Sequence, residues 1–242
     1  NTPPSTPVIA LVPQETDFTG GRPELANTCY DLCAPVGGGS SGSLLLASGL
    51  TASAFILDDF NSALSGWSSA ASGGSAVQSA GQVTISSAGG AAYYTFIKKT
   101  ERTFTNLTTH TLEFKVLLNS IGVSTNGMAL LGWVPTTGTP GANGYFLAVG
   151  AGAVQIWANS GPIYATNLAA ILPSANLYLA LRMTPEGANM IVKSSVYKKA
   201  DGRYNVLFEH TVTNSATPMI GTGGNAFLGV LDTSGPAASS SF

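Results

Sequence analysis

The stretch His110-Thr-Leu-Glu-Phe-Lys-Val116 alternates between apolar and polar side chains. Leu112, Phe114 and Val116 fall on one face and Glu113 and Lys115 on the other, as in a β-strand with one buried face. Similar short runs recur along the chain, separated by glycine, proline, asparagine and serine. They cover residues 81–86, 91–97, 127–134, 144–149, 153–157, 177–183, 189–197, 204–212 and 226–231.

About ten strands at this spacing predict an all-β sandwich or barrel over residues 55–242. Asp201-Gly202 lies between two of the runs and predicts a tight hairpin. No segment shows a convincing apolar period of 3.6, so we expect no helix beyond a single turn at 169–172.

The charge content excludes several classes of protein. The 242 residues carry only 10 Lys and Arg and 12 Asp and Glu, which is 9% against the usual figure of about 25%. Ten dispersed cations do not form the basic surface that a nucleic-acid-binding protein needs. The chain also lacks the ~20 consecutive apolar residues of a membrane span.

Residues 1–54 differ from the rest of the chain. They open with Asn1-Thr-Pro-Pro-Ser-Thr-Pro7 and contain the Gly/Ser linker Gly37-Gly-Gly-Ser-Ser-Gly42. Their scattered apolar residues favour an extended arm that docks on a partner, the alternative being a disordered tail. Cys29 and Cys33 in this segment form either a local disulfide or two free thiols, because zinc would require further ligands.

No charged residue or histidine occurs from Val116 to Leu181, a run of 66 residues. A chain of ordinary composition would place about sixteen charges there. One interpretation is a surface covered by neighbouring subunits or by a neutral ligand. The alternative is a Ser/Thr/Gly-rich surface adapted to an extracellular setting. We favour the first, and therefore expect a homo-oligomer or incorporation into a larger assembly.

The residues argue against an enzyme. Neither His110 nor His210 lies in a recognisable motif with a serine and an acid, and each is predicted as a surface strand residue. The chain has no phosphate-binding glycine motif and no E-x-D-x-x-E string of the kind found in sandwich glucanases. We therefore expect a non-enzymatic protein.

Aromatic side chains in the uncharged run are candidates for glycan binding, because a sugar ring and an aromatic ring both have an apolar face. Neutral amides nearby could complete such a site. The alternative is core packing, and Ile156 and Trp157 cannot both point inward. The candidate glycan-binding residues are Trp133, Tyr145, Trp157, Tyr164, Asn143 and Asn159.

The run Ile56-Leu-Asp-Asp-Phe-Asn-Ser-Ala-Leu-Ser-Gly-Trp67 resembles the first strand of concanavalin A-like (laminin-G-like) jelly-roll domains. The Asp201-Gly202 hairpin and the late apolar strand that ends at Asp232 are also similar to that group. The resemblance covers residues 55–242 and implies an antiparallel two-sheet sandwich, often sugar-binding or adhesive and sometimes containing calcium. It implies no catalytic residues, because the acid motif of the enzymatic branches is absent.

Asp58, Asp59 and Asp232 are candidate calcium ligands. The first and last strands of a jelly-roll often pair, which would bring these carboxylates together, and calcium prefers several oxygen ligands. The alternative is that they end strands and cap turns. We expect no other cofactor.

A proline-rich arm before a neutral β-domain is also similar in style to bacteriophage head-decoration, fibre and tail proteins. We therefore predict a structural or decoration protein of a virion or extracellular assembly. Residues 1–54 and the uncharged surface would bind other subunits, and the sandwich would adhere to glycans. The alternative is a secreted carbohydrate-binding module. The predicted location is the virion surface or the extracellular space.

Overall fold

The computed structural model describes residues 8–11, 33–35, 44–46, 54–56, 58–61, 63–64, 66–71, 74–88, 93–100, 103–104, 111–121, 127–140, 143–150, 152–168, 176–200, 203–216, 223–232 and 237–242. Every regular element in these ranges is a β-strand. Over the same ranges, no helix is long and apolar enough to cross a bilayer.

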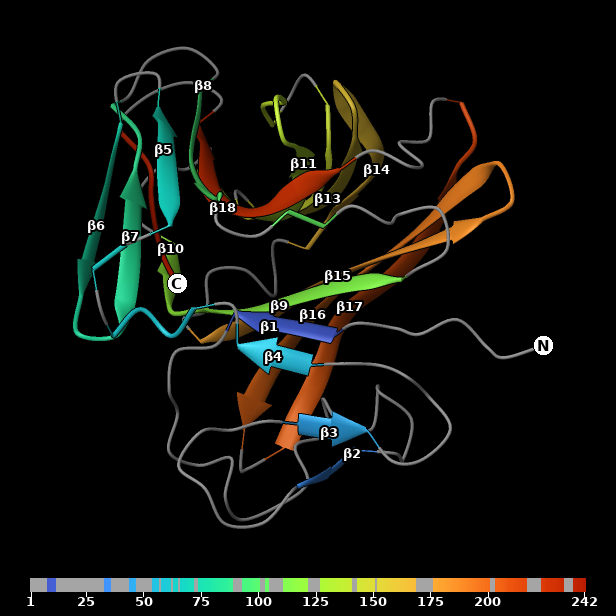
Figure 1. Ribbon diagram of the computed structural model, residues 1–242, viewed down its shortest axis with the longest axis horizontal. Coiled ribbons are helices and arrows are strands. Elements are labelled where there is room, and N and C mark those ends of the chain that lie inside the picture. The colour runs from blue at the N-terminus through green and yellow to red at the C-terminus, as the bar shows by residue number, and fades with distance from the viewer. Residues whose placement is uncertain are drawn as a thin grey trace.

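Two large sheets form the sandwich (Figure 1). The seven-stranded sheet has the order β14 (Gly161–Asn167), β13 (Ala153–Ala158), β12 (Tyr145–Gly150), β11 (Gly127–Pro135), β18 (Gly224–Asp232), β8 (Tyr93–Lys99), β5 (Trp67–Ala71). All of its pairings are antiparallel.

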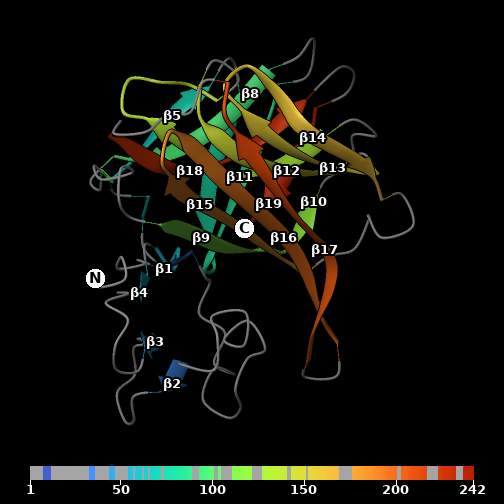
Figure 2. The same ribbon diagram turned by 90° about the vertical axis from the view of Figure 1, so that its right-hand side faces the viewer.

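The six-stranded sheet has the order β17 (Arg203–Asn214), β16 (Asn189–Ala200), β15 (Leu177–Glu186), β9 (Leu112–Leu118), β1 (Val8–Leu11), β4 (Ala54–Ile56). Strands β16 and β17 pair as a long antiparallel hairpin in which Ala200 lies opposite Arg203 (Figure 2), and the predicted turn residues Asp201 and Gly202 lie outside the described ranges. Strand β1 belongs to the segment 1–54, for which no sheet pairing was predicted, and it pairs parallel to both β9 and β4.

Two smaller sheets complete the described strands. One has the order β10 (Ser120–Ile121), β19 (Ser239–Ser241), β7 (Gln82–Ser86), β6 (Ser75–Ser79), and the other pairs β2 (Cys33–Pro35) with β3 (Leu44–Leu46). Val83 and Ile85 of the four-stranded sheet, and Phe242 directly after β19, join the same core as the two large sheets. The all-β sandwich predicted for residues 55–242 is therefore confirmed. The expected boundary at residue 54 stays a prediction, and most of residues 1–54 lie outside the described ranges.

The main core lies between the two large sheets. Phe114, Val116 and Leu181 of the six-stranded sheet meet Leu131, Leu147 and Val149 of the seven-stranded sheet. On β9 the predicted alternation holds, since Leu112, Phe114 and Val116 belong to this core. Glu113 and Lys115 lie on the other face and form an ion pair of 3.3 Å.

Strands β11 and β12 are buried on both faces, which gives the uncharged run a physical reason. One face of β11 belongs to the main core, and the other contributes Met128, Leu130 and Val134 to a second apolar cluster. A charged side chain on either face would lose its hydration without gaining a partner. Within these two strands, burial in the chain's own fold accounts for the missing charge without neighbouring subunits.

The second cluster lines the outer face of the seven-stranded sheet and depends on a glycine. Strand register places Phe146 of β12 and Phe227 of β18 on either side of Gly132 in β11. A β-carbon built on Gly132 would lie 2.5 Å from Phe146 Cβ and 2.5 Å from Phe227 Cε1. Gly132 therefore makes room for the two rings, which pack edge to face with centroids 5.8 Å apart.

Substituting Gly132→Ala should destabilise the sandwich, because the new methyl group overlaps both phenylalanines and the Tyr145 carbonyl oxygen. We expect a loss of about 1–3 kcal/mol, the usual cost of overpacking a core. Thermal and urea unfolding would measure it. Gly161→Ala is the matched control, since nothing lies within 4 Å of its β-carbon position. Equal stability of the two variants would contradict the role given to Gly132.

Candidate functional site

A row of aromatic rings crosses the outer face of the seven-stranded sheet. The register aligns Trp157 of β13 with Phe146 of β12, and Phe146 in turn with Gly132 and Phe227. Trp157 and Phe146 stack with centroids 5.2 Å apart and ring planes 15° from parallel. Phe227 continues the row, and Phe96 of β8 packs against it at 5.8 Å.

Trp157 is the accessible end of this row. Phe146 and Phe227 are fully buried, whereas Trp157 is half-buried and packs against the edge of the cluster. Its indole Nε1 donates a hydrogen bond of 2.8 Å to Gln155 Oε1 on the same strand. The stack and the hydrogen bond together fix the orientation of the indole, so its partly exposed surface is preorganised for a ligand.

The neighbouring strand β14 extends this surface with neutral residues. Pro162 lies opposite Trp157, Ala165 opposite Gln155 and Asn167 opposite Ala153, and all three β14 residues are exposed. Paired residues of adjacent strands point to the same face of a sheet. The β13–β14 hairpin therefore presents an uncharged face of aromatic, apolar and amide groups, which we call the Trp157 surface.

Two of the predicted glycan-binding residues are in the core, so their prediction was wrong. Trp133 and Tyr145 have no exposed surface, and their rings stack with centroids 6.3 Å apart. Asn214 Nδ2 of β17 donates a hydrogen bond of 3.0 Å to the Tyr145 hydroxyl across the sandwich. Neither ring can contact a sugar, because both belong to the alternate positions that face the six-stranded sheet.

Tyr164 points to the opposite face of β14 from Pro162, so it does not belong to the Trp157 surface. Its ring stacks on the His210 imidazole of β17, with centroids 3.6 Å apart and planes 19° from parallel. This contact joins the edge strands of the two large sheets. His210 was expected on an exposed strand surface, but it is half-buried and faces the other sheet.

Asn143 and Asn159 lie near the Trp157 end of the sheet, in the turns that flank β12 and β13. The Asn159 amide donates a hydrogen bond of 2.9 Å to the Gly144 carbonyl, which connects the two turns. Asn159 has a φ of 57°, a conformation that asparagine tolerates better than most residues. The structure therefore brings Trp157, Asn159 and Asn143 to one region, although Oδ1 of Asn143 is buried.

The Trp157 surface also includes Gln155, Pro162 and Asn167, none of which was among the predicted site residues. Gln155 was recognisable only as a neutral amide near Trp157 in the sequence. Pro162 and Asn167 were missed because 161–167 was not predicted as a strand. A proline inside a run argues against a central strand, and β14 accommodates Pro162 because it is an edge strand.

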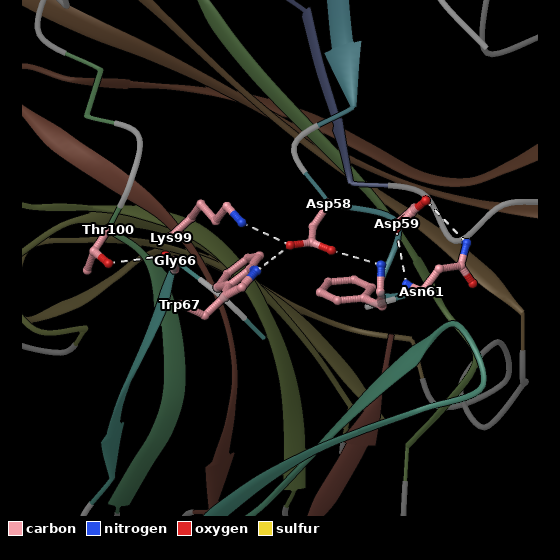
Figure 3. Close-up of polar contacts among 8 residues, drawn as sticks. Asp58, Asp59, Asn61, Gly66, Trp67, Lys99 and Thr100 are labelled. Atoms are coloured by element: carbon pink, nitrogen blue, oxygen red, sulfur yellow. Dashed lines mark hydrogen bonds and ion pairs between the residues drawn. The ribbon is translucent and has the colours of Figure 1, made fainter. Parts of the chain in front are cut away.

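Asp58 is the centre of a second polar cluster, which Figure 3 shows. Its carboxylate accepts hydrogen bonds from Trp67 Nε1 at 2.7 Å and from the Phe60 amide at 2.8 Å, and it pairs with Lys99 Nζ at 2.9 Å. Lys99 also lies over the Trp67 ring, 5.3 Å from its centroid. The cluster ties the segment before β5 to the end of β8, so its role is structural.

Burial acts to raise the pKa of Asp58, but the partners of the carboxylate outweigh it. Hydrogen bonds from Trp67, Lys99 and the Phe60 amide, together with the charge of Lys99, lower the pKa below its usual value of 3.8. Because the charged form is the one that is stabilised, Asp58 suits an ion pair better than a proton-transfer role.

The predicted calcium ligands do not converge. Asp58 contacts Lys99 at one end of β8, whereas Asp232 lies opposite Tyr93 at the other end. Six residues of extended strand separate these ends, roughly 20 Å. The Asp59 carboxylate instead accepts hydrogen bonds from Asn61. The prediction of a calcium site shared by these three residues is therefore wrong, because the length of β8 separates Asp58 from Asp232.

Other predicted metal and redox features are largely beyond the described ranges. Cys29 and His110 lie outside them, and so does the contact between Cys29 and Cys33 that a disulfide would need. Within the part of the chain that the structure describes, no three His, Cys, Asp or Glu side chains gather into a metal-binding group.

Comparison with solved structures returns distant similarity. A protein of unknown function from Shewanella oneidensis MR-1 is 12% identical, covering 74% of this chain and 79% of its own, with a TM-score of 0.47. Winged bean acidic lectin complexed with methyl-α-D-galactose is 8% identical, over 76% of this chain and 95% of its own, with a TM-score of 0.46. Lectin II from Ulex europaeus is 10% identical, over 73% of this chain and 93% of its own, with a TM-score of 0.39.

No protein-family model matches the sequence, and no curated protein matches it. The geometry of the described residues is therefore the basis for a function.

Asp58→Asn should remove a pH-dependent contribution to the free energy of unfolding. The pKa of Asp58 is lowered in the folded state, so the unfolded state binds more protons and stability rises with pH through this range. The contribution is present above the usual pKa and is lost as pH falls through the folded value. We expect the variant to lose about 3 kcal/mol at pH 7, the low end for breaking a buried ion pair.

Urea unfolding at pH 7 and at progressively lower pH would measure this effect. Asp59→Asn is the matched control, because the Asp59 side chain contacts exposed Asn61 rather than Lys99. A variant Asp58→Asn as stable as Asp59→Asn at pH 7 would contradict the structural role of the ion pair.

Proposed function

We propose that this chain is a non-enzymatic β-sandwich that binds a neutral glycan on the Trp157 surface. The observation that carries the proposal is the half-buried indole of Trp157, fixed by Phe146 on one side and by Gln155 through its Nε1. A rigid, partly exposed aromatic ring beside neutral amides is the combination that suits a sugar, whose ring has an apolar face and a hydroxyl edge.

The neutral character of the surface supports an uncharged ligand. Strands β13 and β14 contain no charged residue, and their exposed side chains on this face are proline, alanine and asparagine. The described ion pairs lie elsewhere: Lys193 with Glu209 and Lys115 with Glu113 on the six-stranded sheet, and Lys99 with Asp58 near β5. A uronic acid or sialic acid would find no cation on β13 or β14 to offset the loss of its hydration.

Binding without catalysis is the other part of the proposal. General acid–base catalysis needs a titratable group within hydrogen-bond reach of the bound substrate. On β13 and β14 the only titratable side chain is Tyr164, which stacks on His210 and faces away from Trp157. The carboxylates of Asp58 and Glu209 are engaged with lysines.

The role in a virion or extracellular assembly stays a prediction from the sequence. It depends on residues 1–54 and on contacts with other subunits, and most of that segment is outside the described ranges. The burial of β11 and β12 within the chain removes part of the argument for subunit contacts. For this reason we place glycan binding, the alternative at the sequence level, first.

Trp157→Ala should weaken glycan binding by roughly thirtyfold. Removing a central aromatic residue from a binding site commonly costs about 2 kcal/mol. The measurement is a glycan array that contains neutral, sialylated and sulfated members, followed by calorimetry with the best neutral binder. Gln155→Ala should weaken binding less, since it releases the indole without removing it.

Tyr164→Phe is the matched control, because it retains the stack on His210 and lies on the other face of β14. Full binding by Trp157→Ala, or binding restricted to anionic glycans, would contradict the proposal. Release of reducing ends from a polysaccharide panel, abolished by Asp59→Asn or Glu209→Gln, would contradict the non-enzymatic assignment.

A further inference from the structure

Asp232 at the end of β18 is a buried carboxylate with an incomplete set of partners. The residue is 1% exposed and faces the four-stranded sheet. Its Oδ2 accepts a hydrogen bond of 3.0 Å from the Ser87 hydroxyl. Its Oδ1 is buried and has no hydrogen-bond partner within the part of the chain that the structure describes.

The Ser87 hydroxyl cannot satisfy both oxygens of Asp232. Ser87 Oγ accepts a hydrogen bond of 2.9 Å from the Ala238 amide, and its single proton goes to Asp232. A serine hydroxyl has one donor and two acceptor lone pairs. One lone pair of Ser87 Oγ is therefore still available, next to an uncompensated carboxylate oxygen.

Thr95 adds a second unsatisfied oxygen on the same face of the sheet. Thr95 is 2% exposed, and its Oγ1 has no hydrogen-bond partner among the described residues. Asp232 lies opposite Tyr93, and Thr95 is two residues along β8 from Tyr93. Such diagonal neighbours have Cα atoms roughly 7–8 Å apart and closer β-carbons, so the two side chains are near neighbours on one face of the sheet.

The backbone of Gly74 packs closely against two of the oxygen atoms in this region. A β-carbon built on Gly74 would lie 2.3 Å from Thr95 Oγ1 and 2.4 Å from the Ser86 carbonyl oxygen. Thr95 Oγ1 and the Ser86 carbonyl are thus close neighbours, and Ser86 directly precedes Ser87. One carboxylate, two hydroxyls and one carbonyl therefore lie in the region where β7, β8 and β18 come together.

Within the part of the chain that the structure describes, Asp232 forms no ion pair. Placing a carboxylate in a protein interior costs several kcal/mol unless a counter-charge and hydrogen bonds compensate. Lys98 and Lys99, the cations of β8, lie at the far end of that strand, where they bind the Thr136 carbonyl and Asp58. Neither can reach Asp232.

We propose that Asp232, Thr95 and Ser87 bind a hard metal cation. All the available donors are oxygens, which suit Ca²⁺ or Na⁺ and do not suit zinc or copper. A single carboxylate gives a site of low charge, for which we expect a Kd for Ca²⁺ of about 10⁻⁴–10⁻³ M, as in weak extracellular calcium sites. The site is independent of the glycan proposal, and it contains only Asp232 of the three residues predicted as calcium ligands.

The test uses the full chain after dialysis against a chelator. Its thermal unfolding is then measured in CaCl₂ and in MgCl₂. The effect of Na⁺ is measured by comparing unfolding in NaCl with unfolding in choline chloride of the same ionic strength. At about 10 mM CaCl₂ we expect the Tm of the wild type to rise by roughly 5 °C, because a cation that binds only the folded state stabilises it. Asp232→Asn should abolish this rise, and Thr95→Val should weaken the cation affinity at least fivefold.

Asp59→Asn is the control variant, and it should keep the full response. A response to Ca²⁺ or to Na⁺ that Asp232→Asn loses supports the cation site and identifies the ion. If Asp232→Asn fails to fold, the cation affinity of Thr95→Val tests the proposal instead, and a loss of at least fivefold supports it. A wild type that responds to neither cation, or a response that both the Asp232 and Thr95 variants retain in full, would overturn the proposal.

Discussion

Burial of the central strands of the seven-stranded sheet on both faces is the constraint on which the sandwich depends. Its central strands β11 and β12 have a core on one side and a second apolar cluster on the other. A charged side chain in the middle of such a strand is costly, and small residues are needed where rings from neighbouring strands meet. Gly132 meets that requirement between Phe146 and Phe227, and Gly229 meets it beside Phe96. The second apolar cluster ends at β13, where Trp157 is only half-buried, and the proposed glycan site lies at this end of the sheet.

The same constraint separates the polar groups into two kinds. Asp58 lies at the edge of the core and has a lysine, an indole N–H and a backbone amide around it, so its charge is compensated within the chain. Asp232 lies deeper, between β18 and the four-stranded sheet, and its described partner is a single hydroxyl. Two aspartates that look alike in the sequence thus have opposite electrostatic situations. The first is surrounded by donors and a counter-charge, and the second has one oxygen without a hydrogen-bond partner among the described residues.

Strand positions could be predicted well from the sequence because alternation, hairpin residues and β-branched runs are local signals. The strand at Leu112–Leu118 and the β16–β17 hairpin follow directly from such signals. Strands β6 and β14 were missed because serine, glycine and proline hide their alternation. The orientation of each aromatic residue was beyond local signals, since Trp133 and Trp157 occupy similar neutral runs. Only the pairing of β11 with β18 and of β13 with β14 decides which indole is buried.

A neutral surface that ends in a fixed indole is better suited to binding than to chemistry. An enzyme that transfers protons needs a group whose protonation can change beside the substrate, and such a group must be charged in one of its states. Strands β11 and β13 contain no such group, and the one titratable side chain of β12, Tyr145, is buried in the core and accepts a hydrogen bond from Asn214. What the fold can offer at its accessible end is van der Waals contact with an aromatic face and hydrogen bonds from amides. These are the two interactions that suit a neutral sugar, which has an apolar ring face and a hydroxyl edge. The absence of charge that makes them possible on β13 and β14 is the same property that allows β11 and β12 to be buried.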